Sequence, residues 1–476
     1  MNHLFRQVIL CTFLSCAATA IEAADVTTSA AGQLASLISN PQTETSLRVS
    51  GPVNAVDFLF IAKEMPRLNT LDLAGATIAG CEISSGLSHT VYAENVVPQA
   101  VFAGSPVASL SLPQTGKLEI GDMAFAGSAL KTLTLNDNVA KVGMGAFSSC
   151  NELEQANISK SAHFGSHAFA SCNSLTAVSL NGIESVSEAM FASCPELKTV
   201  GGTENLKYIG PSAFAACSAL DTFVFGNSLQ TVGDGAFSST ALAAADLSAC
   251  DRLTSIGDWA FSSCKELSSI ALPAKLKHIG KGAFFDCRSL AAVDMPETTE
   301  TIGDYALKGL ENVSELEIPA ATHRIGTLAM SGMNSLKNIH AENVSDVPAL
   351  GDDVWDRLAK EAIALHVDQD MVSRFEDAAQ WQDFDIVAEQ SSISDAVVPT
   401  GGISARLDGN TLRVRADEGT LAELYIYDIA GRRFLGNGNV AAEQTEVDLS
   451  QFADKIFVVC ASTDAGVRMA IKIVRK

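Results

Sequence analysis

One repeated pattern constrains the fold of this chain more than any other feature. The stretch IGDWAFSSCKELSSIALP at 256–273 returns as IGKGAFFDCRSLAAVDMP at 279–296. Alignment on the aromatic position of these stretches gives units spaced by 22 to 24 residues. The residues at this position are Phe102, Phe125, Phe147, Phe169, Phe191, Phe214, Phe237, Phe261, Phe284, Leu307 and Met330. Such a period predicts a solenoid of about eleven turns, each packed on its neighbours.

Other positions repeat in each unit and indicate its local structure. Glycine lies four residues before the aromatic position in most units, as at Gly257 and Gly280, which points to a backbone conformation or a close approach that a Cβ would obstruct. Further on, apolar residues follow a leucine with a spacing of two, as in Leu267, Ile270 and Leu272. That spacing is typical of a strand with one buried face. We therefore predict a short strand, a turn, a brief helical corner that carries the aromatic residue, and a return.

Units such as IGKGAFFDCRSLAAVDMP and IGPSAFAACSALDTFVF resemble the BspA-type class of bacterial leucine-rich repeats. The resemblance covers residues 98–341 and implies a leucine-rich-repeat solenoid, an α/β fold with parallel strands. Residues 25–97 resemble the N-terminal cap and first strand units of these proteins, and residues 342–389 resemble their C-terminal cap. Caps are expected because open ends would expose apolar side chains and unpaired backbone groups.

The C-terminal part differs in pattern from the repeats. Segments such as TLRVRA, TEVDLS and KIFVVCAS in residues 403–476 are short and alternating or apolar, which predicts a small antiparallel β-sandwich. Residues 390–402 read as a linker. A plain domain that spaces the repeats from a surface is one interpretation of this sandwich.

The same part also resembles the C-terminal sorting domain of type IX secretion. The matching residues are Tyr427, Asp428, Gly431 and Arg432, and at the basic end Lys472, Arg475 and Lys476. Lys455 and Phe457 depart from the pattern, because they stand where glycine and tyrosine are expected. The resemblance implies that secretion machinery recognises this domain and that the chain crosses an outer membrane to the cell surface or the medium.

The first residues carry the pattern of an export signal. In residues 1–24, Arg6 precedes a short apolar core at 8–14, and small residues follow, so we expect a cleaved signal peptide. A lipoprotein signal, with anchoring at Cys16, is the less favoured alternative. No later stretch approaches the length of apolar sequence that a membrane span needs.

Composition excludes one class of partner. The formal net charge is −23, and basic residues gather only at the C-terminal end. The positive patch that neutralises phosphates in a nucleic-acid-binding protein is therefore missing, and we expect no nucleic-acid partner. Hydrophobic residues make up 47% of the chain, enough for a continuous core.

Cysteine recurs at one position of the repeats, and we call this row of residues the cysteine file. Six cysteines fall three residues after the aromatic position: Cys150, Cys172, Cys194, Cys217, Cys264 and Cys287. Neighbouring turns place these side chains in parallel about 4.8 Å apart. Ligands of one metal ion must converge, and the spacing lies slightly beyond that of a disulfide. We predict buried free thiols, with a disulfide or a metal site as the alternatives.

No pattern of a catalytic site is present. The sequence contains no H-E-x-x-H, no G-x-S-x-G and no P-loop. His163 and His167 fall at different positions of the repeat, so solvated histidines are favoured over a metal pair. Asp352, Asp353 and Asp356 read as a solvated helix start. We therefore predict no enzyme, no cofactor and no metal site.

Three aromatic residues form the candidate partner-binding site. Trp259 and Tyr305 lie two residues before the aromatic position in turns about 10 Å apart, with Gly282 between them and Phe285 nearby. Clustered exposed aromatics can mark an interaction site. Alternatively, they fill local gaps over the corners.

The family resemblance implies a protein that acts in adhesion, or in recognition of a protein or glycan ligand on host matrix or neighbouring cells. A passive coat or spacer is the alternative. The solvent-facing residues of the predicted main sheet favour the coat or spacer, because they include none of the Trp, Tyr and Arg side chains that anchor interfaces.

Overall fold

The computed structural model describes residues 24–85 and 88–389, and most of the C-terminal strands. The described C-terminal ranges are 403–408, 411–416, 419–427, 433–437, 442–449, 456–464 and 468–474. Several predictions fall outside the described residues: the export signal before Ala24 with Cys16, the linker at 390–402, and Asp428, Gly431, Arg432, Lys455, Arg475 and Lys476. The chain divides into two compact units, which are described one by one.

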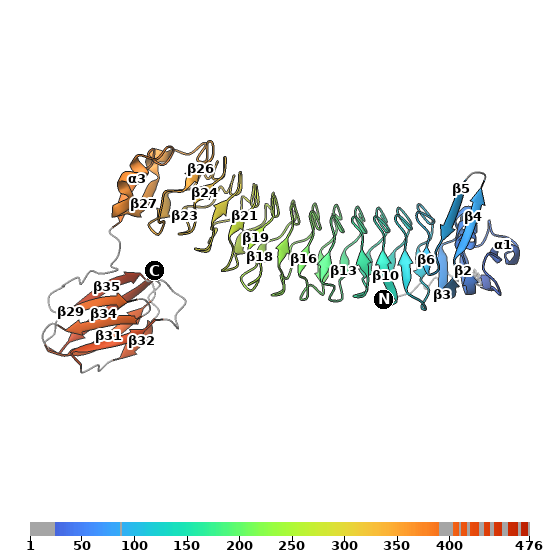
Figure 1. Cartoon of the computed structure of the whole chain (residues 1–476), viewed down its shortest axis with the longest axis horizontal. Coiled ribbons are helices and arrows are strands. Elements are labelled where there is room, and N and C mark those ends of the chain that lie inside the picture. Colours follow the sequence, from blue (N-terminus) through green and yellow to red (C-terminus); the bar gives the residue numbers. More distant parts are fainter. Residues whose placement is uncertain are drawn as a thin grey trace, which may run out of the picture. The chain divides into compact units, whose positions relative to one another are not determined.

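The first unit extends to Leu336 and includes Pro348–Leu358. Its turns follow one another as a solenoid of parallel strands, confirming the predicted fold (Figure 1). One wall carries three-residue strands whose central residue points inward, as Leu133, Ala156 and Val178 do. Its strands are β7 (Ser109–Ser111), β9 (Thr132–Thr134), β11 (Gln155–Asn157), β13 (Ala177–Ser179), β15 (Thr199–Gly201), β18 (Ala244–Asp246), β20 (Ser269–Ala271) and β23 (Glu315–Glu317).

A second wall is built mostly from two-residue strands with one residue outward and one inward. In β16 (Tyr208–Ile209), for example, Tyr208 is exposed and Ile209 is buried. The other strands are β6 (Val96–Val97), β8 (Leu118–Ile120), β10 (Val139–Val142), β12 (His163–Phe164), β14 (Ser185–Val186), β17 (Thr231–Val232), β19 (Ser255–Ile256), β21 (His278–Ile279), β22 (Thr301–Ile302), β24 (Arg324–Ile325) and β26 (Ala349–Leu350).

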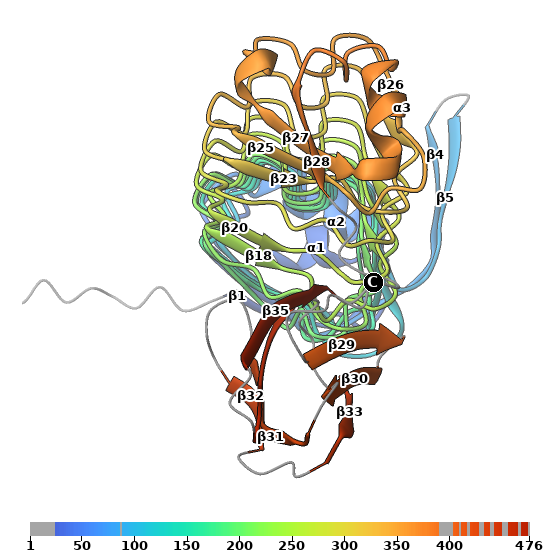
Figure 2. The ribbon, with the colours of Figure 1, turned by 90° about the vertical axis from the view of Figure 1, so that its left-hand side faces the viewer.

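The N-terminal end of this unit is closed by longer elements. Strands β1 (Ala24–Thr27), β2 (Ser46–Val53) and β3 (Thr70–Ile78) continue the parallel pairing, and helices α1 (Leu34–Leu37) and α2 (Ala55–Glu64) cover the core. The buried carboxylate of Asp57 holds this end together, since it accepts backbone N–H bonds from Gly32, Leu34 and Asn54 at 2.6 to 3.0 Å. The hairpin of β4 (Cys81–Ser85) and β5 (Ser88–Tyr92) projects from this end (Figure 2).

The aromatic positions form one column inside the solenoid. The rings of Phe102, Phe125, Phe147, Phe169, Phe191, Phe214, Phe237, Phe261 and Phe284 stack in sequence. Neighbouring centroids lie 5.3 to 5.6 Å apart, and every ring is buried. Each phenyl ring thus contacts the turns on both sides, so the aromatic position holds successive turns together.

The solenoid has about 16 turns, more than the eleven predicted. The turns of β1, β2 and β3 lack the repeated glycine and phenylalanine. One further turn follows that of Met330. Trp355 is buried at its aromatic position, Gly351 lies four residues before Trp355, and the amide of Met330 donates to the carbonyl of Val354. Asp352, Asp353 and Asp356 therefore belong to a corner, and the predicted helix start is wrong.

The corners are successions of turns, so the brief helices predicted there are wrong. Two residues of each corner adopt the left-handed conformation, one two residues before the aromatic position and one two residues after it. Around Phe261 these are Trp259 and Ser263, with φ of 57° and 59°. The amide of each donates along the stack, from Trp259 to the carbonyl of Lys281 at 2.6 Å and from Ser263 to that of Phe285 at 2.7 Å. A helix would keep these amides within one turn.

The repeated glycine is explained by close approach of the backbone. A Cβ on Gly257 would lie 2.6 Å from the carbonyl carbon of Gly233, and one on Gly280 would lie 2.6 Å from that of Gly257. Neighbouring turns therefore touch at this position, and a side chain on these glycines would push them apart. Ser187 is an exception at this position, and its hydroxyl donates to the carbonyl of Gly165 at 3.0 Å.

The cysteine file consists of buried free thiols, as predicted. Each Sγ donates to the carbonyl of a phenylalanine one turn earlier, as from Cys217 to Phe191 at 3.1 Å and from Cys287 to Phe261 at 3.0 Å. Burial is the main cause that raises the pKa of Cys217, Cys264 and Cys287, so these thiols stay protonated near neutral pH.

The second unit begins with a cap of three parallel strands. In register lie β25 (Asn338–Ala341), β27 (Ala364–Asp368) and β28 (Asp385–Glu389), with α3 (Val372–Glu376) between the last two. The short 3-10 helices are η1 (Lys360–Ala362) and η2 (Gln369–Met371). Phe375 of α3 packs edge-on against Trp381, with centroids 5.3 Å apart, and both are buried.

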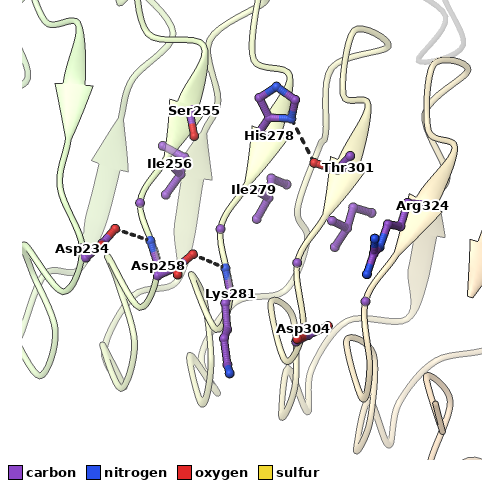
Figure 3. Close-up of a pocket in the computed structure, with 15 residues that line it drawn as sticks. Asp234, Ser255, Ile256, Asp258, His278, Ile279, Lys281, Thr301, Asp304 and Arg324 are labelled. Carbon is purple, nitrogen blue, oxygen red and sulfur yellow. Dashed lines mark hydrogen bonds between the residues drawn. The ribbon is translucent and has the colours of Figure 1, made fainter. Parts of the chain in front are cut away.

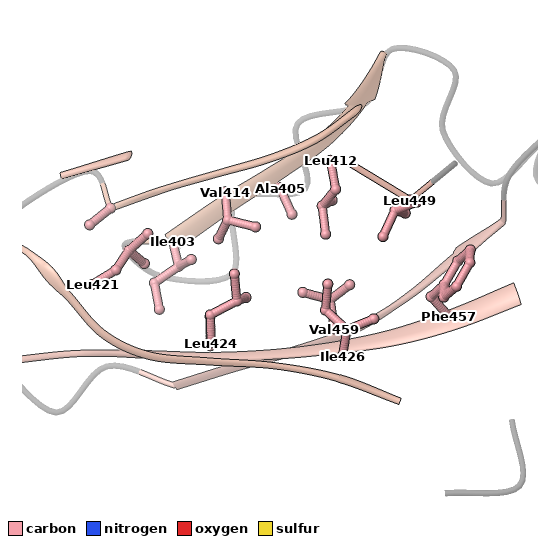
Figure 4. Packing of buried hydrophobic residues seen from close by; sticks show 12 residues of the cluster. Ile403, Ala405, Leu412, Val414, Leu421, Leu424, Ile426, Leu449, Phe457 and Val459 are labelled. Carbon is pink, nitrogen blue, oxygen red and sulfur yellow. The ribbon is translucent and has the colours of Figure 1, made fainter. Parts of the chain in front are cut away.

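The remaining strands of this unit form two antiparallel sheets, as predicted. Their core contains Leu412 and Val414 of one sheet and Leu424, Ile426 and Phe457 of the other, with all side chains between the layers (Figure 4). One sheet has the order β29 (Ile403–Asp408), β30 (Thr411–Ala416), β33 (Gln444–Asp448), and the other β32 (Arg433–Asn437), β31 (Leu421–Tyr427), β34 (Ile456–Thr463), β35 (Arg468–Val474). Among the described residues, no helix is long and apolar enough to cross a membrane.

Candidate functional site

The structure brings the three predicted aromatic residues into contact. The ring of Trp259 lies 5.6 Å from that of Phe285, edge to face, and 6.3 Å from that of Tyr305, nearly parallel. All three side chains are half-buried. The rings of Trp259 and Tyr305 are closer than the expected 10 Å because the indole leans over Gly282, where an added Cβ would overlap it. We call Trp259, Phe285 and Tyr305 the aromatic patch.

The backbone of the aromatic patch is unusual for large side chains. Trp259 and Tyr305 have φ of 57° and 58°, and Gly282 between them has the same conformation at 57°. A residue with a Cβ pays about 1–2 kcal/mol for this conformation relative to glycine. Since Gly145 and Gly235 occupy the same position of earlier corners, the fold accepts glycine there. The two large aromatics are therefore not required by the backbone.

Two lysines border the aromatic patch. The Nζ of Lys281 lies 5.6 Å from the ring centroid of Tyr305, and that of Lys308 lies 5.4 Å from it. Both distances fall within the range of a cation–π contact. The sequence does not indicate these lysines, because they lie one residue before Gly282 and one residue after Leu307, at positions of the repeat that carry no recurrent residue.

A groove of about 540 Å³ lies along the turns that carry the aromatic patch, and Trp259, Phe285 and Tyr305 are not among the residues that line it (Figure 3). Lys281 lines this groove together with Asp258 and Asp304, which directly precede Trp259 and Tyr305 in sequence. The Asp258 carboxylate accepts the backbone N–H of Lys281 at 2.7 Å, so it is fixed in position. His278 on the same wall contacts the hydroxyl of Thr301 at 2.9 Å.

The groove and the aromatic patch offer complementary chemistry. Aromatic faces stack on flat apolar surfaces, and ammonium and carboxylate groups form directed hydrogen bonds with polar ones. Apolar surface with a few fixed polar groups is the usual composition of a binding site.

The repeats themselves identify the family. Residues 95–355, more than half of the chain, match the BspA type leucine-rich repeat region in six copies. The matched stretches cover 95–220, 162–264, 185–312 and 244–355. The chain belongs to the BspA-type leucine-rich repeat family. This confirms the resemblance seen in the repeats, whereas the resemblance of the C-terminal domain to a sorting domain stays a prediction.

Solved structures of leucine-rich repeat proteins are also similar. One from Bacteroides ovatus is 17% identical with a TM-score of 0.48, over 77% of this chain and 92% of that chain. The pneumococcal vaccine antigen PcpA is 15% identical with a TM-score of 0.33, over 72% and 80%. A leucine-rich repeat protein of T. pallidum is 25% identical with a TM-score of 0.27, over 43% and 83%. No curated protein matches the chain.

Other predicted positions lie apart from the groove. In this BspA-type repeat, His163 stands on the outer side of β12 and His167 at the left-handed position of the next corner, and both are exposed. The outward row of the main wall contains small and polar residues such as Thr132, Gln155 and Thr199, all exposed. The aromatic patch therefore differs from the described surface of this wall.

Proposed function

We propose that this BspA-type protein is exported to the cell surface and acts there in adhesion or recognition through the aromatic patch. The observation that carries the proposal is the gathering of three half-buried aromatic rings and two lysines on left-handed corners that accept glycine elsewhere. Strained positions with large side chains are a recurrent sign of a functional site. Membership of a family of surface repeat proteins supports the proposed location at the cell surface.

The expected ligand follows from the chemistry of the patch and groove. Trp259 and Tyr305 offer faces that suit a sugar ring or a flat side chain. Lys281 and Lys308 favour a negative group beside that face, in a protein whose net charge is −23. A glycan or protein ligand on host matrix or neighbouring cells that carries carboxylates fits both features. Binding rather than catalysis is the proposed role.

Replacement of two of the rings tests this function. The mature protein is incubated with an array of matrix proteins and glycans at physiological salt, and bound ligands are then measured against the Trp259→Ser, Tyr305→Ser double variant. We expect at least a tenfold loss of affinity with a melting temperature near that of the wild type, since both rings are half-buried rather than in the core.

The matched control is Tyr208→Ser, which removes an exposed tyrosine from the second wall, in a turn before the patch. Its affinity should equal that of the wild type. Intact binding by the double variant, accompanied by destabilisation, would show that the rings only fill gaps over the corners. A wild type that binds nothing on the array would favour the spacer function instead.

We propose further that the C-terminal β-sandwich is the signal for secretion, of the type IX kind. It has a core of its own, in which Leu412, Val414 and Phe457 are fully buried, so it can fold as a separate module. Tyr427, which ends β31, begins the matching motif. Deletion of residues 401–476 should leave a folded solenoid in the periplasm of a suitable host, as seen by cell fractionation. Unchanged surface display of the deletion variant would refute this role.

A further inference from the structure

Two histidines of the second unit stack on neighbouring strands. His340 of β25 and His366 of β27 are register partners, so their side chains leave the same face of the sheet. Their ring centroids lie 4.7 Å apart, and the ring planes differ by 13°. The strands bring together residues that are 26 positions apart in the sequence, outside the repeat pattern.

Carboxylates accompany both imidazoles. The Nδ1 of His340 lies 2.9 Å from Oε1 of Glu342, and the Nδ1 of His366 lies 2.8 Å from Oε1 of Glu389. Nε2 of His366 is 3.4 Å from Oδ1 of Asn338. Glu342 lies in the turn directly after β25, and its carboxylate reaches back to His340. Two nitrogen donors and two carboxylates thus meet on one face.

The geometry points to a metal site: we propose that His340, Glu342 and His366 bind a divalent transition-metal ion of the Zn²⁺ type. Each of the three residues offers one potential ligand atom, and these three atoms lie within 4.8 Å of one another. Ligands of a tetrahedral zinc ion are roughly 3.3 Å apart, given bonds of about 2.0–2.1 Å. Rotation of the side chains closes this difference, and the backbone stays in register.

The donor set suits such an ion better than it suits calcium or magnesium. Imidazole nitrogen is a preferred ligand of zinc, copper and nickel, whereas calcium and magnesium take oxygen ligands. Glu389 has a second role in this arrangement. A carboxylate that accepts the Nδ1–H of a histidine fixes the ring and leaves Nε2 as the nitrogen that can turn to a metal.

Access and charge support the same conclusion. The side chain of His366 is 19% exposed, and those of Glu342 and His340 are 31% and 37% exposed, so an ion can enter without unfolding the cap. The two glutamates balance the charge of a divalent cation. The bound ion would join β25 to β27, two strands that belong to one cap.

Calorimetric titration of zinc into the full chain tests the site. The protein is prepared without a polyhistidine tag, treated with a chelator, dialysed and titrated with ZnCl₂, and the Co²⁺ complex is examined by visible absorption. We expect one ion per chain at this site, with a dissociation constant on the order of 10 µM or lower, as befits a site with three protein ligands. Intense d–d bands of the Co²⁺ complex would report tetrahedral coordination.

Variants locate the binding. His366→Ala and Glu342→Gln should each weaken zinc binding at least tenfold, and Glu342→Gln keeps the size of the side chain, so the fold is retained. The matched control is His278→Ala, which removes an exposed histidine that also contacts a neighbouring strand, through Thr301. The control should bind zinc as the wild type does. Weak or absent zinc binding by the wild type, or unchanged affinity of the folded Glu342→Gln variant, would overturn the proposal.

Discussion

The corners before residue 250 and those from 257 to 309 have the same backbone but present different side chains at their first left-handed position. In the earlier corners this position holds Ala100, Met123, Gly145, His167, Ala189, Ser212 and Gly235, all with positive φ. In the later corners it holds Trp259, Gly282 and Tyr305, also with positive φ. The column of stacked phenylalanines continues from the earlier corners to Phe284 without change in spacing, and Leu307 takes the aromatic position in the turn of Tyr305.

This difference separates what the fold needs from what it tolerates. Positions that recur in nearly every turn, such as the stacked phenylalanine and the glycine four residues before it, touch the neighbouring turns and are fixed by packing. The left-handed position accepts residues from glycine to tryptophan, so its side chain is set by something other than the fold. A solenoid can therefore carry a local binding site without altering its core.

The largest expected effect concerns the part that both groups of corners share. Phe214 is fully buried. Its ring centroid lies 5.5 Å from that of Phe191 and 5.4 Å from that of Phe237. Phe214→Ala should lower the free energy of unfolding by about 3–5 kcal/mol, because the cavity opens between two turns. Denaturant melts measure the change. Tyr208→Ser, in the same turn but at the surface, should cost less than about 0.5 kcal/mol.

A loss below about 1 kcal/mol for Phe214→Ala would contradict the idea that the aromatic column holds the turns together. The aromatic column would then be no more constrained by packing than the left-handed position.

Much of the shared part was predictable from sequence alone. The period of 22 to 24 residues fixed the aromatic column, and the register of strands such as β11 and β13 followed from the spacing of apolar residues. These positions repeat many times, so each one is supported by the others. The turn of Trp355 departs from the pattern, although Gly351 lies four residues before Trp355. Trp355 follows Met330 by 25 residues instead of 22 to 24, and its corner is rich in aspartate.

The second expected effect tests the close approach of the turns. A Cβ on Gly280 would meet the backbone of Gly257 at 2.6 Å, whereas one on Gly201 meets nothing within 4 Å. Gly280→Ala should therefore cost about 1–3 kcal/mol, because backbone rather than a movable side chain is in the way. Gly201→Ala should be neutral or slightly stabilising. Equal stabilities of the two variants in denaturant melts would refute the explanation of the repeated glycine.

The parts of the site that escaped prediction share a physical cause. The contacts of Lys281 and Lys308 with Tyr305 depend on the left-handed backbone, which tryptophan and tyrosine do not themselves indicate. The glycines at the same position of other corners, such as Gly145 and Gly235, are the one signal of a positive φ there. The pairing of His340 with His366 depends on strand register beyond the repeats, where no period exists to fix it. Sequence periodicity locates positions in the stack and leaves the direction of their side chains open.

A pair of glycine variants sharpens the comparison of the corners. Gly282 and Gly235 have φ of 57° and 63° at equivalent positions, so alanine suffers the same backbone strain in both. A Cβ on Gly282 also displaces the indole of Trp259, whereas one on Gly235 meets only the hydroxyl of Ser212 at 3.4 Å. Gly282→Ala should be less stable than Gly235→Ala by about 1 kcal/mol.

Tryptophan fluorescence provides the specific measurement for this pair. Trp259 is half-buried, whereas Trp355 and Trp381 are almost fully buried. Displacement of Trp259 therefore changes the solvent exposure of the indole that is already the most exposed of the three. We expect a red shift of the emission for Gly282→Ala and none for Gly235→Ala. The same spectrum for both variants would mean that Trp259 does not lie on Gly282 in solution.

The smallest expected effect returns to an ordinary corner. Ser212 has φ of 52° and lacks the aromatic contacts of Trp259, so its side chain gains little in exchange for the strain. Ser212→Gly should raise the free energy of unfolding by up to about 1 kcal/mol, since relief of the left-handed strain slightly exceeds the entropy that glycine loses on folding. Ser228→Gly is the matched control: Ser228 is also half-buried but is not left-handed, so the same change should be destabilising. Destabilisation by both variants would show that the left-handed position is not strained, and the large side chains at Trp259 and Tyr305 would then need no functional explanation.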